Sequence, residues 1–384
     1  MKLVGCRHVG SPQGSWLRLN GNVNFRRLPP GIPLVGINRR VRGRLESGMN
    51  APDLRSLSVT LADVARLAGV SAMTVSRVVN TPERVPPATV KRVQAAATKL
   101  GYVRNRMAGG LRSNKSQLVA AIVPALSSPV FSDTIEALTE GLASRGYHLI
   151  VGQTGYAEPR EDEILRDIIS RRPDAIVLTG TMHSTEGKRL LLSAGVPVLE
   201  TWDLTDSPID MLIGFSHEAI GAAVSQHLYE RGRRRLALIG ADDIRSRRRW
   251  RAYERGARKL GLKDPIAHFV PAPAKLGDGR RALKALLERA RDIDGIFCSS
   301  DMLAAGVLIE AHALRIKVPS MLSVVGFGDL NFACDLNPSL TSVRVDAARI
   351  GHLAAETIVK RLHAAAVPDP IVDVGFSIIQ RDSS

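Results

Sequence analysis

The fold is decided by residues 60–80, which read Thr-Leu-Ala-Asp-Val-Ala-Arg-Leu-Ala-Gly-Val-Ser-Ala-Met-Thr-Val-Ser-Arg-Val-Val-Asn. The spacing of the apolar residues predicts two short helices joined by a turn at residues 69–71. Thr60 can cap the first helix together with Asp63, because a hydroxyl and a carboxylate three residues apart satisfy free backbone amides at a helix start. Gly69 falls in the turn, where a positive φ favours glycine.

The second predicted helix runs from Ala72 to Val79 behind the capping residue Ser71. Its valines at positions 75, 78 and 79 face inward. The residues left facing outward are Ala72, Met73, Thr74, Ser76, Arg77 and Asn80. Two helices arranged in this way form a helix-turn-helix, whose second helix can enter the major groove of DNA.

A third helix is predicted over residues 88–100, with Pro86-Pro87 in front of it and Gly101 behind it. Its apolar stripe of Val90, Val93, Ala97 and Leu100 closes a three-helix head over residues 58–104. Residues 105–116 form a basic connection that contains Gly109-Gly110. Two adjacent glycines make a helix in this connection unstable by itself, and a plain flexible linker is the alternative.

Positive charge is concentrated at the N-terminal side of this 384-residue chain, whose formal net charge is +16. Residues 1–48 carry nine Lys or Arg and one acid, and residues 58–113 carry nine and two, so the remainder is nearly neutral. A basic head on a neutral body is typical of a nucleic-acid-binding protein, although a solvated basic surface is the alternative.

The rest of the composition excludes several classes of protein. No apolar run is long enough to cross a membrane, and the three cysteines have no paired spacing, so neither disulfides nor a zinc site is expected. We expect a cytoplasmic protein without a cofactor.

Residues 1–57 are expected to form a basic extension without regular structure. Met49 is followed by a short lead-in to the head, and we expect Met49 to be the true start of translation. The alternative is a disordered basic arm that adds non-specific attraction to DNA.

From residue 117 to 384, strand-like and helical segments alternate, which predicts an α/β core with parallel sheets covered by helices on both faces. The length suggests two such subdomains, with a ligand cleft at the carboxyl ends of the strands. The expected strands are 118–123, 147–153, 175–179, 197–200, 211–215, 236–240, 295–299 and 323–327, and the expected helices are 131–144, 158–170, 185–194, 217–231, 249–260, 280–290, 302–314 and 347–363.

The string Thr-Val-Ser-Arg-Val-Val-Asn over residues 74–80 and the string Leu-Gly-Tyr-Val-Arg-Asn-Arg over residues 100–106 resemble the DNA-binding head and hinge of the lactose-repressor (LacI/GalR) family. The resemblance runs from Val59 to Phe376. Within the family, residues 155–160, 200–203 and 325–329 are similar to the gluconate-type members. The resemblance implies a periplasmic-binding-protein-like core whose chain crosses between the subdomains near Gly214, near Thr341 and again toward the C-terminus.

The resemblance also implies a set of DNA contacts. Arg77 would read a guanine, since its two-pronged guanidinium suits the O6 and N7 atoms. Ala72 and Met73 match the specificity pair of the family, and because both are apolar they suit a thymine methyl group or a shape preference. The remaining predicted DNA-binding residues are the phosphate-contacting positions Thr60, Ser71, Thr74, Ser76 and Asn80, together with Leu61, Asn105 and the minor-groove wedge Leu111.

The predicted effector site lies in the cleft. Arg249, four residues before Tyr253, matches an Arg that grips a sugar or a carboxylate, although a solvated helix face is expected for two of the four arginines at 247, 248, 249 and 251. Asp301 is either a cleft residue or the cap of the following helix. The other predicted effector-binding residues are Ser127, Phe131, Glu200, Asp203, Ser300 and Asp329, with Tyr156 and Thr181 as further candidates.

Carboxylates for hydroxyl groups and an Arg for an acid group favour a sugar acid such as gluconate as the effector. The sequence therefore predicts a homodimeric, effector-controlled transcriptional regulator that binds double-stranded operator DNA; repression is the commoner sense, and activation is the alternative. A transport binding protein with the same core and a sugar-metabolising enzyme are the rival classes. The basic head argues against the first, and the absence of a GxSxG, HExxH or P-loop motif argues against the second.

Overall fold

A computed structural model describes residues 59–103 and 116–384, apart from residues 157, 182 and 366. The chain divides into two compact units, residues 1–105 and residues 106–384. The predicted extension over residues 1–57 and the hinge residues Asn105 and Leu111 lie outside the described residues.

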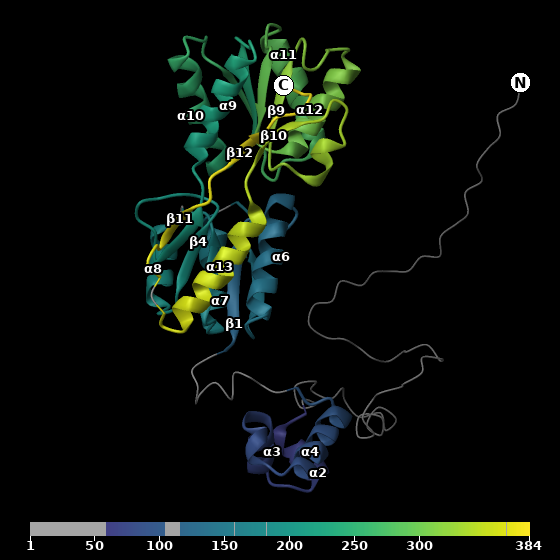
Figure 1. Cartoon of the computed structure of the whole chain (residues 1–384), viewed down its shortest axis with the longest axis vertical. Helices are drawn as coiled ribbons and strands as arrows, with labels where there is room; N and C mark the ends of the chain where they lie inside the picture. The colour runs from purple at the N-terminus through teal and green to yellow at the C-terminus, as the bar shows by residue number, and fades with distance from the viewer. Residues whose placement is uncertain (1–58, 104–115, 157, 182, 366) are drawn as a thin grey trace, which may run out of the picture. The chain divides into compact units, whose positions relative to one another are not determined.

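The first unit contains the three-helix head (Figure 1), formed by α2 (Leu61–Ala68), α3 (Ala72–Asn80) and α4 (Pro87–Leu100), with a 3₁₀ turn η2 (Pro82–Arg84) before α4. Thr60 and Asp63 form the predicted capping box, and Gly69 ends α2 with a φ of 62°. Ser71 caps α3 by accepting a hydrogen bond from the amide of Thr74. Local sequence signals therefore fix both ends of the helix pair.

A small apolar core holds the three helices of the head together. Val64 and Val75 are fully buried between α2 and α3, and Val93 of α4 closes the cluster. On α4 the second buried residue is Ala96, whereas the predicted stripe had placed Ala97 there. Helix α4 is thus rotated slightly from the predicted orientation. Residues 96 and 97 are both alanine, so the side chain alone does not decide which of them faces the core.

The second unit consists of two lobes, each built on a six-stranded sheet (Figure 1). In the first lobe, α6 (Pro129–Ala143) and α13 (Ala347–Leu362) lie side by side on one face of the sheet, and α7 (Glu158–Ser170) and α8 (Thr185–Ser193) cover the other. All strand pairs of this sheet are parallel, in the order β11-β5-β4-β3-β1-β2. The strands are β1 (Leu118–Val123), β2 (His148–Gln153), β3 (Ala175–Thr179), β4 (Val198–Thr201), β5 (Met211–Gly214) and β11 (Ile371–Asp373).

The second lobe repeats this plan, with α9 (His217–Glu230) and α10 (Ile244–Lys259) on one face and α11 (Leu276–Arg289) and α12 (Asp301–Ala313) on the other. Its strand order is β12-β10-β9-β8-β6-β7, and only β12 runs antiparallel. The strands are β6 (Leu236–Ala241), β7 (Ile266–Val270), β8 (Gly295–Cys298), β9 (Ser323–Phe327), β10 (Thr341–Arg344) and β12 (Ser377–Ile379), and a 3₁₀ turn η3 (Asn331–Cys334) follows β9.

The chain crosses between the lobes three times: after β5, after β10 and between β11 and β12. The first crossing runs through Phe215 and Ser216, near the predicted Gly214. The second runs through Val345 and Asp346, slightly beyond the predicted Thr341. These crossings bring the carboxyl ends of both sheets to one cleft.

The α/β architecture with a helix-turn-helix head is confirmed, and four strands are additions to the prediction. The segments β7, β10, β11 and β12 were not predicted, because each is short and β7, β11 and β12 lie at sheet edges where polar residues interrupt the apolar run. Helix α10 begins at Ile244 instead of Arg249, because Asp243 caps it and its arginine-rich first turns hide the apolar period. In the described parts of the chain, no helix is long and apolar enough to span a membrane.

Candidate DNA-binding face and effector cleft

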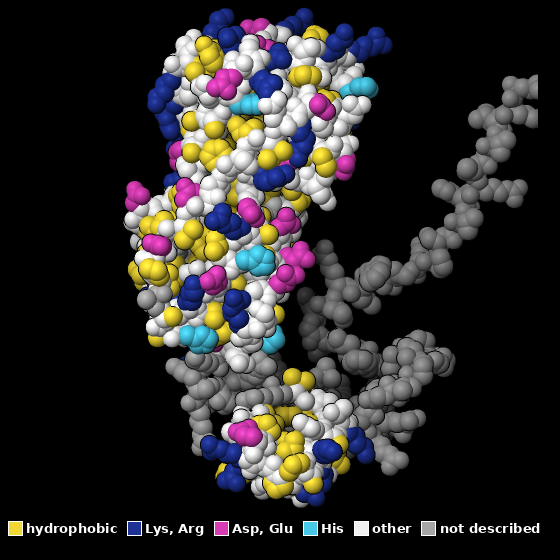
Figure 2. Space-filling view, in the orientation of Figure 1, with side chains coloured by type: hydrophobic (Ala, Val, Ile, Leu, Met, Phe, Trp, Pro, Cys, Tyr) yellow, Lys and Arg dark blue, Asp and Glu magenta, His cyan; other side chains and the backbone are white. Residues whose placement is uncertain are grey.

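The outer face of α3 is accessible over most of its length. Ala72, Met73, Arg77 and Asn80 are exposed, with Met73 at 65%, and Thr74 and Ser76 are half-buried. Arg77 has no ion pair among the described residues of the head. Lys and Arg side chains flank hydrophobic ones on the face of the head that Figure 2 shows. This helix presents an arginine and small or flexible side chains, which is what a base-reading helix requires.

Two of the polar residues predicted to contact phosphate, Thr60 and Ser71, also cap helices. Thr60 exchanges hydrogen bonds with Asp63, and these bonds lower the pKa of the Asp63 carboxyl. Ser71 Oγ lies 2.9 Å from Thr74 Oγ1, and Asn80 Nδ2 donates to the carbonyl of Ser76. Leu61 is half-buried at the start of α2. These hydrogen bonds restrain the side chains of Thr60, Ser71 and Asn80.

A cavity of about 270 Å³ lies in the cleft between the two lobes of the core. Four of the predicted effector residues, Ser127, Phe131, Arg249 and Ser300, line it. Trp202 and His217 line it as well. Ser127 and Phe131 belong to the first lobe, while Arg249 and Ser300 belong to the second, so a bound molecule would touch both.

Cations outnumber carboxylates in the walls of this cavity. Arg245, Arg249 and Lys275 line it together with a single acid, Asp243. The carboxylate of Asp243 accepts a hydrogen bond from the amide of Ser246 at the start of α10. None of the three cations forms an ion pair with a described residue. The cavity therefore favours an anion.

Arg249 is the most constrained of these cations, since it is 4% exposed. Its Nη1 donates to His217 Nδ1 (3.0 Å), its Nη2 donates to the carbonyl of Ser299 (3.3 Å), and its guanidinium lies 4.2 Å from the centroid of the Phe327 ring. Its Nε is buried without a hydrogen-bond partner. Burial lowers the pKa of Arg249 to about 10, so the side chain stays charged at neutral pH.

His217 holds Arg249 by accepting a hydrogen bond, which fixes the state of its imidazole ring. Its Nε2 lies 3.1 Å from the carbonyl of Trp202, which can only accept, so Nε2 carries the proton and Nδ1 carries the lone pair. Burial and the adjacent guanidinium of Arg249 hold the pKa of His217 well below its ordinary value. The neutral ring is therefore an acceptor toward Arg249 and a donor toward the first lobe.

This pair of bonds continues into the first lobe as a hydrogen-bond relay. Trp202 Nε1 donates to Thr134 Oγ1 (3.1 Å) on α6, and Thr134 Oγ1 donates to the carbonyl of Ala347 (2.9 Å) at the start of α13. His217 follows the first crossing and Ala347 follows the second. The relay thus joins the cation of the cavity to two of the three crossings between the lobes.

An aromatic cluster surrounds the relay. The ring centroids of Phe131 and Trp202 are 5.2 Å apart, and those of Trp202 and Phe215 are 5.6 Å apart, both in edge-to-face contact. Phe215 also lies 6.3 Å from Phe327 of the second lobe. These rings belong to an apolar core that extends from one lobe into the other, so the lobes are packed against each other at the back of the cavity.

A second cavity of about 230 Å³ adjoins the first, and the two share Tyr156, Asp243 and Arg245. The predicted effector residue Asp203 lines this second cavity, as does Thr181. Asp203 is buried, and its Oδ1 pairs with Arg248 Nη1 at 2.5 Å. Burial raises the pKa of Asp203, and the charge of Arg248 opposes this rise.

Glu200, another predicted effector residue, lines neither cavity. Its carboxylate accepts a hydrogen bond from the amide of Ile209 (2.7 Å) and lies 3.2 Å from His183 Nε2. His183 Nδ1 in turn lies 2.6 Å from Glu161 Oε1. The carboxylate of Glu200 is therefore fully engaged within the first lobe.

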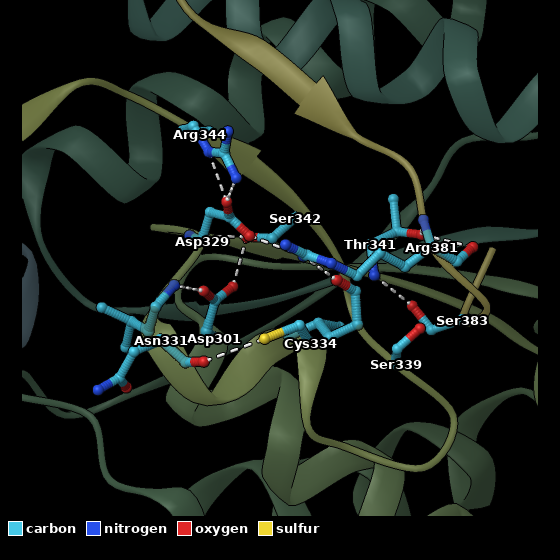
Figure 3. Close-up of polar contacts among 12 residues, drawn as sticks. Asp301, Asp329, Asn331, Cys334, Ser339, Thr341, Ser342, Arg344, Arg381 and Ser383 are labelled. Carbon is cyan, nitrogen blue, oxygen red and sulfur yellow. Dashed lines mark hydrogen bonds and ion pairs between the residues drawn. The ribbon is translucent and has the colours of Figure 1, made fainter.

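Asp329 also lies outside both cavities and is held between two arginines (Figure 3). Arg344 and Arg381 pair with its carboxylate at 2.5 Å and 2.7 Å. Asp329 lines a neighbouring hollow of about 480 Å³ at the second crossing, together with Arg344 and Asp346. These contacts connect the end of β9 with β10 and with the C-terminal residues.

Asp301 adopts neither of its two predicted roles. Ser300 caps α12, while the buried carboxylate of Asp301 accepts hydrogen bonds from Ser342 Oγ (2.6 Å) and the amide of Leu330 (2.7 Å). Burial raises the pKa of Asp301 to about 6, although these two hydrogen bonds oppose the shift. Asp301 thus fixes the loop after β9 (Figure 3).

The run of arginines on α10 divides as expected. Arg247 and Arg251 are exposed, and Arg247 pairs with Asp242 at the surface. Arg248 reaches Asp203, and Arg249 is buried.

Sequence reasoning missed several residues that line the first cavity: Trp202, Arg245 and Lys275. Trp202 lay inside a stretch already recognised as similar to the gluconate-type members, so its position beside Asp203 could have indicated it. Arg245 lies two residues before the recognised arginine run, one helical turn before Arg249, and could have been found once the true start of α10 was known. No signal in the sequence distinguishes Lys275.

Comparisons with known proteins agree with this geometry. A family model described as bacterial regulatory proteins, lacI family, matches residues 60–105, and a periplasmic binding protein-like domain matches residues 225–384. The chain is 35% identical to the HTH-type transcriptional regulator GntR of Pseudomonas aeruginosa, over 85% of this chain and 95% of that protein. It is 28% identical to the ribose operon repressor of Escherichia coli, over 85% of this chain and 99% of that protein. Its structure resembles that of a LacI-family transcriptional regulator from Silicibacter pomeroyi with a TM-score of 0.81 and 34% identity, covering 85% of this chain and 99% of that chain.

The chain therefore belongs to the lacI family of bacterial regulatory proteins. Its relatives are transcriptional regulators, which confirms the prediction of a regulator and not an enzyme.

The acid–histidine–acid arrangement in the first lobe generates a prediction about stability and pH. The side chain of His183 is 2% exposed; burial alone would lower its pKa, but the hydrogen bonds to Glu161 and Glu200 raise it to about 9. A group with a raised folded-state pKa stabilises the fold fully below its unfolded pKa and loses that contribution as the pH rises through the folded value.

We therefore expect the free energy of unfolding to fall by up to about 3 kcal/mol between pH 6.5 and 9 through this group. Replacement of His183 by Gln should flatten this part of the pH profile in urea unfolding, whereas the same replacement of the exposed His312 should not. An unchanged slope in the His183→Gln variant would show that the ring is neutral in the fold.

Proposed function

We propose that this protein is a cytoplasmic, homodimeric repressor that binds an operator through α3 of its head and is released when a sugar acid such as gluconate binds between the lobes. Two heads related by a dimer axis suit a near-palindromic operator. The exposed face of α3 and the unpaired Arg77 support the first part of the proposal.

The single observation that carries the effector assignment is the buried cation Arg249. A charge removed from water costs several kcal/mol unless an opposite charge or a full set of hydrogen bonds compensates it. The neutral His217, one carbonyl, an aromatic face and the more distant charges of Asp243 and Asp203 compensate Arg249 only in part. No described carboxylate forms an ion pair with Arg249, and its Nε is left without a partner. A carboxylate in the cavity would complete its coordination with two parallel hydrogen bonds.

The other walls of the cavity support an acid rather than a neutral sugar. Arg245 and Lys275 add positive charge, and the rings of Phe131 and Trp202 provide the apolar surfaces against which a carbon chain can pack. Asp203, which follows β4 and pairs with Arg248, lines the adjoining second cavity and supplies a carboxylate that can accept a hydrogen bond from a hydroxyl. An acid with a hydroxylated carbon chain can bind to the cations, the aromatic rings and the carboxylate at the same time.

The hydrogen-bond relay provides a route from the effector to the lobe crossings. A carboxylate on Arg249 competes with His217 for the guanidinium, and any change at His217 acts on the carbonyl of Trp202. Thr134 then passes the change to the start of α13. An effector can alter operator affinity only if it binds one arrangement of the lobes more tightly than the other.

Arg77→Ala should weaken operator binding by about 1–3 kcal/mol, because a bidentate contact to a guanine is lost. The loss of affinity should appear only with operators that retain the base pair containing the guanine contacted by Arg77. Mobility-shift titrations on the operator and on single-base variants measure this, with the exposed Arg66 of α2 replaced by Ala as the control. An equal loss on every sequence would make Arg77 a phosphate contact only.

Arg249→Met should weaken gluconate binding to the full-length protein by about 2–5 kcal/mol, as measured by titration calorimetry. The same variant should keep or raise the stability of the core, because a buried and incompletely paired charge is removed. Arg251→Met, on the exposed side of the same helix, is the control. Tighter binding of glucose than of gluconate by the parent protein would refute an acid effector.

Thr134→Val should separate effector binding from the change in operator affinity that follows it. The substitution removes the acceptor of Trp202 Nε1 and the donor to the Ala347 carbonyl, while Thr134 itself lines neither cavity. We expect gluconate affinity to change by less than about threefold, while the ratio of operator affinities without and with gluconate falls toward one. Thr139→Val on the exposed side of α6 should leave that ratio unchanged, and an unchanged ratio in both variants would exclude the relay as the route.

A further inference from the structure

The two cavities of the core are arms of one forked cleft. Tyr156, Asp243 and Arg245 line both of them, so the arms meet at these three side chains. The first arm, which contains Arg249, has a volume of about 270 Å³, and the second arm has about 230 Å³. Small-molecule sites usually span about 300–1,000 Å³, so the first arm alone is small and the two arms together fall within that range.

The second arm differs chemically from the first. Four carboxylates line it: Glu161, Asp203, Asp242 and Asp243. Each uses one oxygen on a partner within the protein. The partners are His183 Nδ1 for Glu161 (2.6 Å), Arg248 Nη1 for Asp203 (2.5 Å), Arg247 Nε for Asp242 (2.7 Å) and the amide of Ser246 for Asp243 (2.8 Å).

The second oxygen of each carboxylate is available. Oε2 of Glu161 and Oδ2 of Asp242 and Asp243 accept no hydrogen bond from the described residues. Oδ2 of Asp203 has only the long contact of 3.4 Å from Thr181 Oγ1. A carboxylate oxygen has room for two hydrogen bonds, so the arm offers several unused acceptors beside its donors, which include Thr181, Arg245 and Arg247.

Neighbouring groups of the protein largely compensate the negative charge of these carboxylates. Three of them lie against His183, Arg247 or Arg248, and Asp243 lies at the positive start of α10. A bound cation would therefore gain little, and no group of His, Cys, Asp or Glu in the described residues is arranged to hold a metal ion. Neutral groups that donate hydrogen bonds, namely hydroxyls, match the arm best.

We propose that the second arm binds the hydroxylated tail of the effector, while the acid group lies at Arg249 in the first arm. The ligand is then an open-chain polyhydroxy acid that must be long enough to reach both arms, and Arg245 at the fork donates to its middle oxygens. This inference rests on the proposed function, since it takes the acid group at Arg249 as given. It adds a length requirement and names Glu161 and Asp242 as residues that determine specificity.

Two acids of different length test this assignment on the full-length protein. Gluconate, with six carbons, reaches both arms, whereas glycerate, with three, carries the same acid group and fills only the first. In Asp242→Asn and in Glu161→Gln we expect gluconate to bind about tenfold more weakly by calorimetry, and glycerate, measured by displacement of gluconate, to bind with unchanged affinity. Asp264→Asn is the matched control, because Asp264 is also an exposed partner of an arginine on α10.

The outcomes distinguish the two levels of the proposal. Gluconate affinity that stays within twofold in both arm variants, or that falls equally for gluconate and glycerate, overturns the second arm as a tail site and leaves the acid site intact. Failure of both acids to bind the parent protein, with binding of neutral sugars instead, overturns the acid effector itself and the tail site with it. Thermal unfolding of each variant verifies that the fold is retained.

Discussion

A guanidinium buried without a carboxylate is the constraint on which the effector core depends. Arg249 is buried against His217 of α9, the carbonyl of Ser299 and the Phe327 ring. Helices α9 and α10 approach so closely that a Cβ at Gly221 would lie 2.2 Å from the Arg249 carbonyl oxygen. The helix packing therefore fixes the backbone of Arg249, and burial prevents water from solvating its charge. The cleft, whose first cavity Arg249 lines, offers room for a compensating anion.

The neutral state of His217 follows from the same constraint. A protonated ring would place a second positive charge against Arg249 and would lose the lone pair that holds it. Because the other ring nitrogen donates to the Trp202 carbonyl, one residue connects the second lobe to the first. The aromatic cluster around this connection packs the lobes together, and discrete repacking of such a cluster is how small shifts at a site become domain movements.

Buried acids in this fold are engaged first with cations and amides of the protein. Glu200 and Asp329, which motif position suggested for hydroxyl groups, are occupied by His183 and by Arg344 with Arg381. The physical reason is that a carboxylate withdrawn from water requires a charged or hydrogen-bonding partner at once. Asp203 and Asp242 also have partners, but both line the second cavity, and in each the Oδ2 atom accepts no close hydrogen bond from the described residues. The acids that can contact a ligand are those that line the cleft at the carboxyl ends of the strands.

The sequence by itself determined the head and the alternating order of the core. Thr60, Ser71 and Gly69 act through contacts within four residues of themselves, and fully buried strands such as β1 appear directly as apolar runs. Only the tertiary structure decided which arginine of α10 is buried, which acids are already paired and how β10 and β12 close the second sheet. Those outcomes depend on partners far away in the sequence, as Thr134 and Ala347 are 213 positions apart, and local periodicity carries no information about such distant contacts.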